Sequence, residues 1–262
     1  GADEILAGYD LFKEARVRRF MAREPGSRAR AAMLSRLYGY LPDSPTSARS
    51  LAAARWQADA GDPDDPLFAH RGRMQAGGRI DALWSPAWRA ELAAHGGAAL
   101  DAAYAALLPP GSAHWPALGR DQLGEALTLL PGYLLSTQGD RMAMAHGIEL
   151  RHPFLDSELV DWVGRLPPAR KLRGLREKHL LRKAMHARLP VPLRDRPKQP
   201  FRAPDSTSFF DAEGRLPDWA QALTQAPALE RLGWFDVPRV QRLLDKGRAG
   251  RIIGFADNMA LV

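Results

Sequence analysis

The chain has 262 residues, a net charge of +7 and 45% apolar residues. That apolar content is sufficient for a folded core, and no apolar run of about 18 residues suggests a membrane span. There is no cysteine, which excludes disulfides, Cys-ligated zinc and a thiol nucleophile within this chain. The basic excess is spread along the sequence, as expected either for solvated surface charge or for a phosphate-bearing partner.

Most of the sequence predicts helix. The amphipathic or capped runs, in chain order, are 11–24, 44–59, 86–108 with a break at Gly96-Gly97, 120–130, 176–189 and 236–247. The charged, glycine-rich stretch 61–80 predicts a surface loop. No run alternates convincingly over six residues, so we expect few strands and one mainly helical domain, or a large piece of one.

Some side chains within these elements receive a predicted role. In the first helix, the residues expected to face the core are Leu11, Ala15, Val17, Phe20 and Met21. Met142, Met144 and Ala145 are also expected in the core. Asp156 and Asp236 are expected to cap the helices that follow them, and Gly247 to stop the last one.

The opening GADEILAGYD places two acids, Asp3 and Glu4, among glycines that permit tight turns. Adjacent carboxylates beside a turn suit Mg²⁺, which takes oxygen ligands and commonly shares them with substrate phosphates. An ordinary helix N-terminus, where acids are favoured by the helix dipole, explains the same residues. Both interpretations stay open on the residues alone.

Residues 134–163, LLSTQGDRMAMAHGIELRHPFLDSELVDWV, gather charges inside an apolar frame. Asp140, Arg141, Glu149 and Arg151 either pair with one another in a structural network, as buried charges must, or form the polar wall of a site. The segment is therefore a second candidate for chemistry.

DRPKQPFRAPDS, residues 195–206, holds Lys198 between prolines. Proline stiffens the backbone and removes a hydrogen-bond donor. A lysine on such a loop is a preorganised positive charge, suited to a phosphate or to charge developing in a transition state. The alternative is an exposed turn on a basic surface.

These stretches, in this order, resemble the synthetase domain of glutamine-hydrolysing asparagine synthetases. GADEILAGYDLFKEA is similar to the end of the family's S-G-E-G-A-D-E-x-x-x-G-Y motif, and LLSTQGDRMAMAHGIELRHPFLDSELV to its D-R-M-x-M-A-H-x-x-E-x-R-x-P-F-L-D motif. KLRGLREKHLLRKA and RPKQPFRAP are similar to its K-x-x-L-R and R-P-K-x-x-F segments. FADNMALV resembles a stretch near its C-terminal end. The strong match covers about 60 to 70 residues across the chain.

The resemblance implies an ATP- and Mg²⁺-dependent ligase. The β-carboxylate of aspartate is adenylated with release of pyrophosphate, and glutamine-derived ammonia then gives asparagine and AMP. By position, Asp3 is similar to the residue that helps hold Mg²⁺ and pyrophosphate, with Glu4 beside it. Lys198 is similar to the lysine that contacts phosphate and the acyl centre. Asp140, Arg141, Glu149 and Arg151 fall in a motif that shapes the site.

The resemblance also implies a fold: the helical C-terminal portion of an α/β PP-loop (adenine nucleotide alpha hydrolase-like) ATP pyrophosphatase synthetase domain, with most parallel strands upstream. Residues 1–262 are then a partial domain. The family's glutaminase domain, with its catalytic cysteine, and its S-G-G-x-D-S ATP loop have no counterpart here. Both ends read as cut from a longer chain, and we expect the isolated chain not to make asparagine.

Three alternatives remain. A related amidotransferase would act on another carboxylate, giving a lactam, peptide or sugar-linked product, because shared parts of a site do not specify the acceptor. A basic helical nucleic-acid-binding protein would bind with steep salt dependence. A non-catalytic scaffold is the third. The leading interpretation predicts a cytoplasmic protein that has neither nucleic acid nor membrane as a partner. It leaves a homodimer open for the parent protein.

Overall fold

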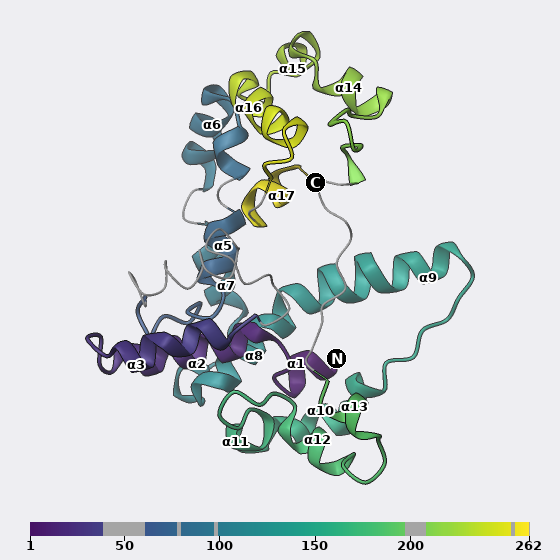
Figure 1. Ribbon diagram of the computed structural model, residues 1–262. Coiled ribbons are helices and arrows are strands. Elements are labelled where there is room, and N and C mark those ends of the chain that lie inside the picture. The colour runs from purple at the N-terminus through teal and green to yellow at the C-terminus, as the bar shows by residue number, and fades with distance from the viewer. Residues whose placement is uncertain (39–60, 78–79, 97–98, 197–207, 253–254, 262) are drawn as a thin grey trace. The chain divides into compact units, whose positions relative to one another are not determined.

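The computed structural model describes residues 1–38, 61–77, 80–96, 99–196, 208–252 and 255–261 (Figure 1). Over these residues the chain is helical and has no β-strand, only two isolated bridges, Trp84 with Phe235 and Arg173 with Arg176. The expectation of a mainly helical chain with few strands is confirmed. The helix expected at 44–59 lies outside the described residues.

The chain divides into two compact units. The first comprises the described parts of 1–40, 52–70 and 107–198, and the second those of 71–106 and 199–262.

The first unit is a set of short helices around α2. Its elements are α1 (Ala2–Ile5), α2 (Asp10–Ala22), α3 (Arg28–Ala31), η1 (Ala32–Arg36), η3 (Ser112–His114), α8 (Ala117–Leu127), η4 (Leu130–Asp140), α9 (Arg141–Ala145), η5 (Pro153–Leu155), α10 (Ser157–Gly164), α11 (Pro168–Lys171), α12 (His179–Ala184) and α13 (Val191–Arg194). The helix α10 begins as predicted, because the Asp156 carboxylate accepts a hydrogen bond from the Leu159 N–H.

Helix α2 carries the core of this unit. The buried residues on it include Leu11, Phe12, Ala15, Val17 and Met21. They confirm four of the five predicted core positions. The exception is Phe20, which is 39% exposed. The Arg30 guanidinium lies over the Phe20 ring, 4.2 Å from the ring centroid.

The prediction of a surface loop over 61–80 is wrong for its middle. Leu67, Phe68, Ala69 and His70 are all buried, and Phe68 packs in the same cluster as Phe12 of α2. The charged and glycine-rich neighbours obscure this short apolar run in the sequence. Residues 71–77 then form a helix of the second unit.

Helix α8 lies beside α2 (Figure 1) and is tied to it by charge. Both carboxylate oxygens of Asp121 accept hydrogen bonds from the Arg19 guanidinium, at 2.6 and 2.8 Å. Asp121 is only 2% exposed. This two-pronged contact compensates the burial of both charges and fixes the spacing of the two helices.

A π-helix, η4, follows α8 and leads into α9. Such helices are rare and often accompany functional sites. The prediction that Met142, Met144 and Ala145 lie in the core is wrong for this structure: all three are exposed, whereas Ala143 is buried. On a one-turn helix, only one side can face the unit.

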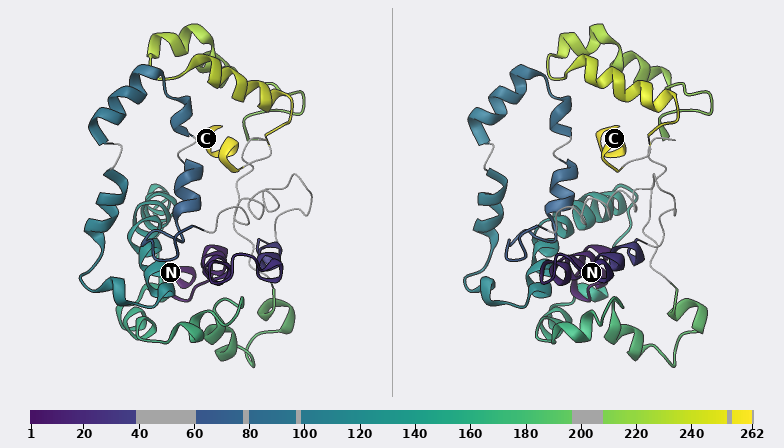
Figure 2. Two further views of the ribbon diagram at one scale, coloured as in Figure 1. Left: turned by 90° about the vertical axis from the view of Figure 1, so that its left-hand side faces the viewer. Right: turned by 60° about the vertical axis from the view of Figure 1, so that its left-hand side comes forward.

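The second unit contains longer amphipathic helices. Its elements are α5 (Arg71–Gly77), η2 (Ile80–Leu83), α6 (Pro86–Gly96), α7 (Ala99–Leu107), α14 (Asp218–Thr224), α15 (Ala226–Leu232), α16 (Val237–Arg248) and α17 (Phe255–Leu261). Helices α14, α15 and α16 follow one another in contact, as the yellow-green ribbons of Figure 2 show. Helices α6 and α7 lie on either side of the expected break.

Helix α16 confirms one predicted boundary and corrects the other. The Asp236 carboxylate accepts the Arg239 N–H at 3.1 Å, as expected of an N-cap. Gly247, predicted to stop the helix, lies inside it. A Cβ there would meet the Phe210 ring at 2.2 Å, so the glycine allows the ring of the core cluster to pack on the helix backbone.

Candidate functional site

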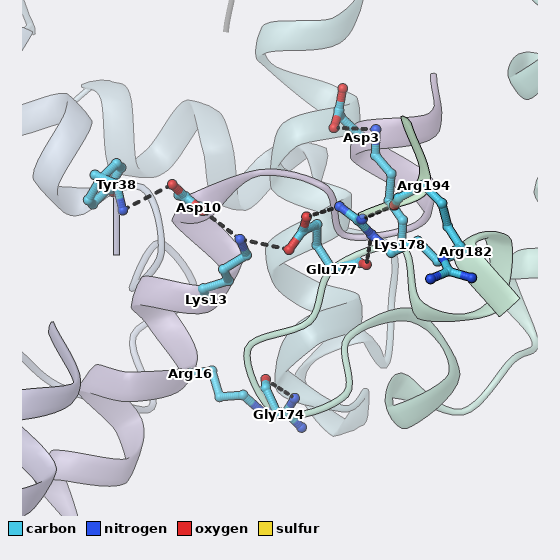
Figure 3. A network of polar contacts seen from close by, with 10 residues as sticks. All are labelled: Asp3, Asp10, Lys13, Arg16, Tyr38, Gly174, Glu177, Lys178, Arg182 and Arg194. Carbon is cyan, nitrogen blue, oxygen red and sulfur yellow. Dashed lines mark hydrogen bonds and ion pairs between the residues drawn. The ribbon is translucent and has the colours of Figure 1, made fainter. Parts of the chain in front are cut away.

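The sequence candidate Asp3 forms an ion pair with Lys178 in the first unit. The Asp3 Oδ1 and Lys178 Nζ atoms are 2.9 Å apart, and the two side chains are 25% and 24% exposed. Asp3 lies on the first turn of α1, and Lys178 is the residue that precedes α12. A negative and a positive side chain, each partly exposed, thus meet where two segments 175 residues apart in sequence come together (Figure 3).

The backbone around Lys178 is unusual. Its φ of 49° and ψ of 35° place it in the left-handed region, which costs energy for a residue with a side chain. Its N–H donates to the Leu6 carbonyl at 3.1 Å. This bond ties the start of α12 to the end of α1, so the backbones of Asp3 and Lys178 are held together independently of their ion pair.

Gly8 provides the space in which the pair forms. A Cβ at this position would lie 2.0 Å from Asp3 Oδ1 and 2.3 Å from Lys178 Cε. Both separations are far below van der Waals contact, so any side chain here would displace the pair. The glycine of the opening motif is therefore required by close approach.

A buried network supports the segment that carries Lys178 (Figure 3). Lys13 of α2 bridges Asp10 Oδ1 and Glu177 Oε2, each at 2.8 Å from its Nζ. Glu177, which is buried, also pairs with Arg182 of α12. Arg182 in turn donates to the Arg194 carbonyl at 2.6 Å.

The charges in this network reinforce one another. Burial opposes ionisation of Glu177, but the hydrogen bond and charge of Lys13, with a smaller effect of Arg182, hold the pKa of Glu177 below its usual value. Burial likewise opposes the charge on Lys13, but hydrogen bonds to Asp10 and Glu177 outweigh it and raise the pKa of Lys13. Both groups stay ionised near neutral pH, which fixes α2 to the residue next to Lys178.

The turn before Glu177 is anchored to α2 as well. Arg16 donates to the carbonyls of Leu172 and Gly174, at 2.7 and 3.0 Å. Arg173 and Arg176 pair through their backbones, and Gly174 takes a φ of 59°. This turn explains why the helix predicted from residue 176 begins only at His179. The fold therefore holds Lys178 on a rigid segment, as a preorganised charge requires.

Glu4 has a different place from its neighbour. It is buried, and its carboxylate accepts a hydrogen bond from the Tyr9 hydroxyl at 2.6 Å. Burial, with the hydrogen bond to Glu4, raises the pKa of Tyr9. Gln122 of α8 donates to the Glu4 carbonyl at 2.6 Å. Glu4 thus anchors α1, whereas Asp3 faces the accessible side.

The two acids of this motif differ in exposure, because Asp3 is partly exposed and Glu4 is buried. Mg²⁺ keeps several waters and is commonly held by one or two carboxylates together with substrate phosphates, so Asp3 is a suitable donor once the Lys178 ammonium has moved away from it. Among the described residues there is no group of three or more His, Cys, Asp or Glu side chains that would hold a metal without a substrate.

The charges of 134–163 form one of the expected pairs. Arg151 Nη2 and Glu149 Oε2 are 2.8 Å apart, and their side chains are 78% and 81% exposed. The Asp140 Oδ1 and His152 Nε2 atoms are 3.9 Å apart, and the Arg141 side chain is exposed. The segment that follows, η5, packs on α1. Their role as a site wall stays a prediction, and Lys198 lies outside the described residues.

The segment 171–184 carries part of the family resemblance, but none of its residues was predicted to lie in the site. Lys178 is the first residue of K-x-x-L-R, completed by Leu181 and Arg182. Glu177 and Lys13 gave no signal of their own, because their role depends on a contact between α2 and the residue before α12.

Comparison with known proteins identifies the family of the chain. The family model "Asparagine synthase" matches residues 1–261, so the chain belongs to the asparagine synthase family. A putative glutamine-hydrolysing asparagine synthetase of Mycobacterium tuberculosis is 34% identical over 139 residues, which cover 53% of this chain and 21% of that protein. Asparagine synthetase 3 of Bacillus subtilis is 42% identical over 62 residues, 24% of this chain and 10% of that protein.

A third relative bears a different name. "Amidase chry2" of Gibberella zeae is 31% identical over 124 residues, 45% of this chain and 18% of that protein. The chain spans about a fifth of the length of the first relatives it matches. No solved structure matches it. None of the helices in the described part of the chain has the length and apolarity needed to cross a membrane.

Proposed function

We propose that this chain supplies the helical part of a PP-loop-type synthetase domain in an ATP-dependent, amide-forming ligase. The observation that carries the proposal is the pair of accessible opposite charges, Asp3 and Lys178, held on segments that the fold ties together. Membership of the asparagine synthase family makes aspartate the first acyl substrate to test, with ammonia from glutamine as the nucleophile.

The reaction divides into two displacements. An oxygen of the substrate carboxylate attacks the α-phosphorus of ATP, and pyrophosphate leaves. Ammonia then attacks the acyl carbon, and AMP leaves with the oxygen that formed the mixed anhydride. Bound Mg²⁺ would neutralise phosphate charge, with Asp3 as its protein ligand.

Lys178 would hold the pyrophosphate oxygens as negative charge develops on them. A donor that is already in place needs no reorganisation at that moment. Glu177 and Lys13 would act indirectly by fixing the segment from which Lys178 projects. Lys198 would be a second cation at the acyl centre.

The substrate has one alternative that a specific observation favours. A relative named as an amidase matches at 31% identity, close to the 34% of an asparagine synthetase. Site parts that handle ATP are shared more readily than those that select an acceptor. The alternative is therefore a ligase that joins ammonia or another amine to a different carboxylate.

The test is substrate-dependent AMP formation by the protein as its cell produces it. Lys178→Ala should lower the aspartate-dependent rate by about 10²- to 10³-fold, as removal of a preorganised donor does, and Lys178→Arg should restore part of it. Lys183→Ala, which removes an exposed lysine from the same helix, is the matched control.

The outcomes separate the alternatives. AMP formed only with aspartate supports asparagine formation, whereas AMP formed only with another carboxylate supports the related amidotransferase. Normal AMP formation by Lys178→Ala would remove Lys178 from the reaction. Lys198→Ala is expected to lower adenylate formation by orders of magnitude with the fold intact, and a near-normal rate would remove that residue too.

A further inference from the structure

The two groups proposed to meet Mg²⁺ and phosphate meet each other in this structure. Asp3 Oδ1 lies 2.9 Å from Lys178 Nζ, so each charge already has an opposite charge beside it. The carboxylate contacts an ammonium where a metal cation would bind, and the ammonium contacts a carboxylate where a phosphate oxygen would bind. How the pair couples the binding of Mg²⁺ to that of phosphate rests on the proposed function.

The pair is built into the fold rather than formed by two mobile surface chains. Gly8 leaves room for both side-chain ends, which a Cβ would approach to 2.0 and 2.3 Å. The N–H of Lys178 is bound to the Leu6 carbonyl, and Glu177 is fixed by Lys13 at 2.8 Å. The backbone stays in place when the two side chains separate, so the pair can open without unfolding the site.

Opening the pair has a cost that depends on what binds. Pyrophosphate alone would contact Lys178 but leave it beside Asp3, whose negative charge repels the ligand. Mg²⁺ alone would contact Asp3 but leave it beside the ammonium, which repels the cation. When both bind, each group exchanges one opposite charge for another, and the local charge stays balanced.

We propose that the Asp3–Lys178 pair is an internal latch that makes the binding of Mg²⁺ and pyrophosphate mutually dependent. In this arrangement, Asp3 suppresses binding of metal-free polyphosphate, and Mg²⁺ relieves the suppression by taking Asp3 as its ligand. The coupling is reciprocal: pyrophosphate must strengthen Mg²⁺ binding by the same factor.

The latch predicts an effect of unusual sign. Removing the Asp3 charge should strengthen pyrophosphate binding when Mg²⁺ is absent, because Lys178 is released. The same substitution should abolish the additional strengthening that Mg²⁺ gives. A carboxylate that acted only as a metal ligand would change nothing in the absence of metal, and one that only started a helix would change neither measurement.

The experiment is calorimetric titration of the protein as its cell produces it with inorganic pyrophosphate, first with EDTA and then with Mg²⁺. Asp3→Asn should bind metal-free pyrophosphate about fivefold more tightly than wild type, the upper range for a partly exposed ion pair. Lys178→Ala should lose most binding in both conditions. Asp161→Asn on α10, an exposed acid, makes the same change in net charge and should leave both affinities within about twofold.

A second measurement needs no variant. The reactivity of Lys178 toward an amine-selective ester, read by peptide mass spectrometry, should change little when Mg²⁺ or pyrophosphate is added alone, and should fall when the second of the two is added. Lys183, exposed on the same helix, is the internal reference and should change in neither step.

The results distinguish the latch from the site. If wild type binds pyrophosphate but Asp3→Asn binds it equally or more weakly without metal, the latch is wrong and the phosphate site stands. If pyrophosphate protects Lys178 as fully without Mg²⁺ as with it, the latch is wrong as well. If neither wild type nor Asp3→Asn binds pyrophosphate in either condition, the proposed function of the site is overturned and the latch falls with it.

Discussion

Gly8→Ala is the substitution that separates the geometry of the site from the stability of the fold. The new Cβ would stand 2.0 Å from Asp3 Oδ1 and 2.3 Å from Lys178 Cε. Unbonded atoms of this kind approach to about 3.5 Å, so each side-chain end must move by more than about 1 Å. The third neighbour, the Asp3 Cα, is at 3.0 Å and needs only a small shift.

These displacements predict a large loss of activity and a small loss of stability. Both crowded groups are ends of flexible side chains on a partly exposed surface, so we expect the free energy of unfolding to fall by about 1 kcal/mol, the lower range for overpacking. A misplacement of about 1 Å in a catalytic group costs about 10²-fold in rate. We therefore expect carboxylate-dependent AMP formation to fall by about 100-fold.

Urea unfolding measures the stability and AMP release measures the rate. Gly119→Ala is the matched control: it adds the same methyl group to α8, where nothing lies within 4 Å. It should stabilise the helix by about 0.5–1 kcal/mol and leave the rate unchanged. If Gly8→Ala keeps a wild-type rate, Asp3 and Lys178 are not required to be where the structure places them, and the reasoning about the site fails.

Three further predictions concern the framework. The pKa of Glu177 in the folded chain lies below its ordinary 4.5, so its contribution to stability is present above that pH and is lost as the pH falls through the folded pKa. Glu177→Gln should therefore flatten the acid side of a plot of unfolding free energy against pH. An unchanged plot would contradict the ion pair with Lys13. Asp121→Asn removes the carboxylate charge that pairs with the Arg19 guanidinium and should lower the unfolding free energy, measured with urea, by about 3 kcal/mol. A loss below about 1 kcal/mol would show that the pair is solvated. Asp236→Ala should cost about 1 kcal/mol by removing the N-cap of α16, and no change in the melting temperature would contradict the cap.

Local signals predicted the helices well where a cap or a periodic pattern was present. Asp156 and Asp236 both accept the backbone N–H expected of an N-cap. Gly247 shows the limit of the same reasoning, since its role is set by the Phe210 ring, a residue remote in sequence. The buried run at Phe68 was missed for a similar reason: burial there depends on α2 and not on the residues beside it.

The site was only half predicted. Asp3 was identified because its motif is local, but its partner Lys178 became apparent only when the fold brought α1 and the start of α12 together. Likewise, the residue types alone made Asp3 and Glu4 equal candidates for a metal ligand. The structure separates them, because the hydrogen bond from Tyr9 holds Glu4 inside the unit. Backbone geometry, such as the left-handed conformation of Lys178, has no signal in residue types.

Transfer of a labelled oxygen tests the central claim most directly. The protein as its cell produces it would be incubated with ATP, Mg²⁺, glutamine and aspartate whose β-carboxylate carries oxygen-18. Adenylation predicts that one labelled oxygen passes from the carboxylate to AMP, and that Lys178→Ala slows this transfer together with pyrophosphate release. Turnover that yields AMP without label would contradict attack of the carboxylate on the α-phosphorus, and with it the role proposed for Asp3 and Lys178.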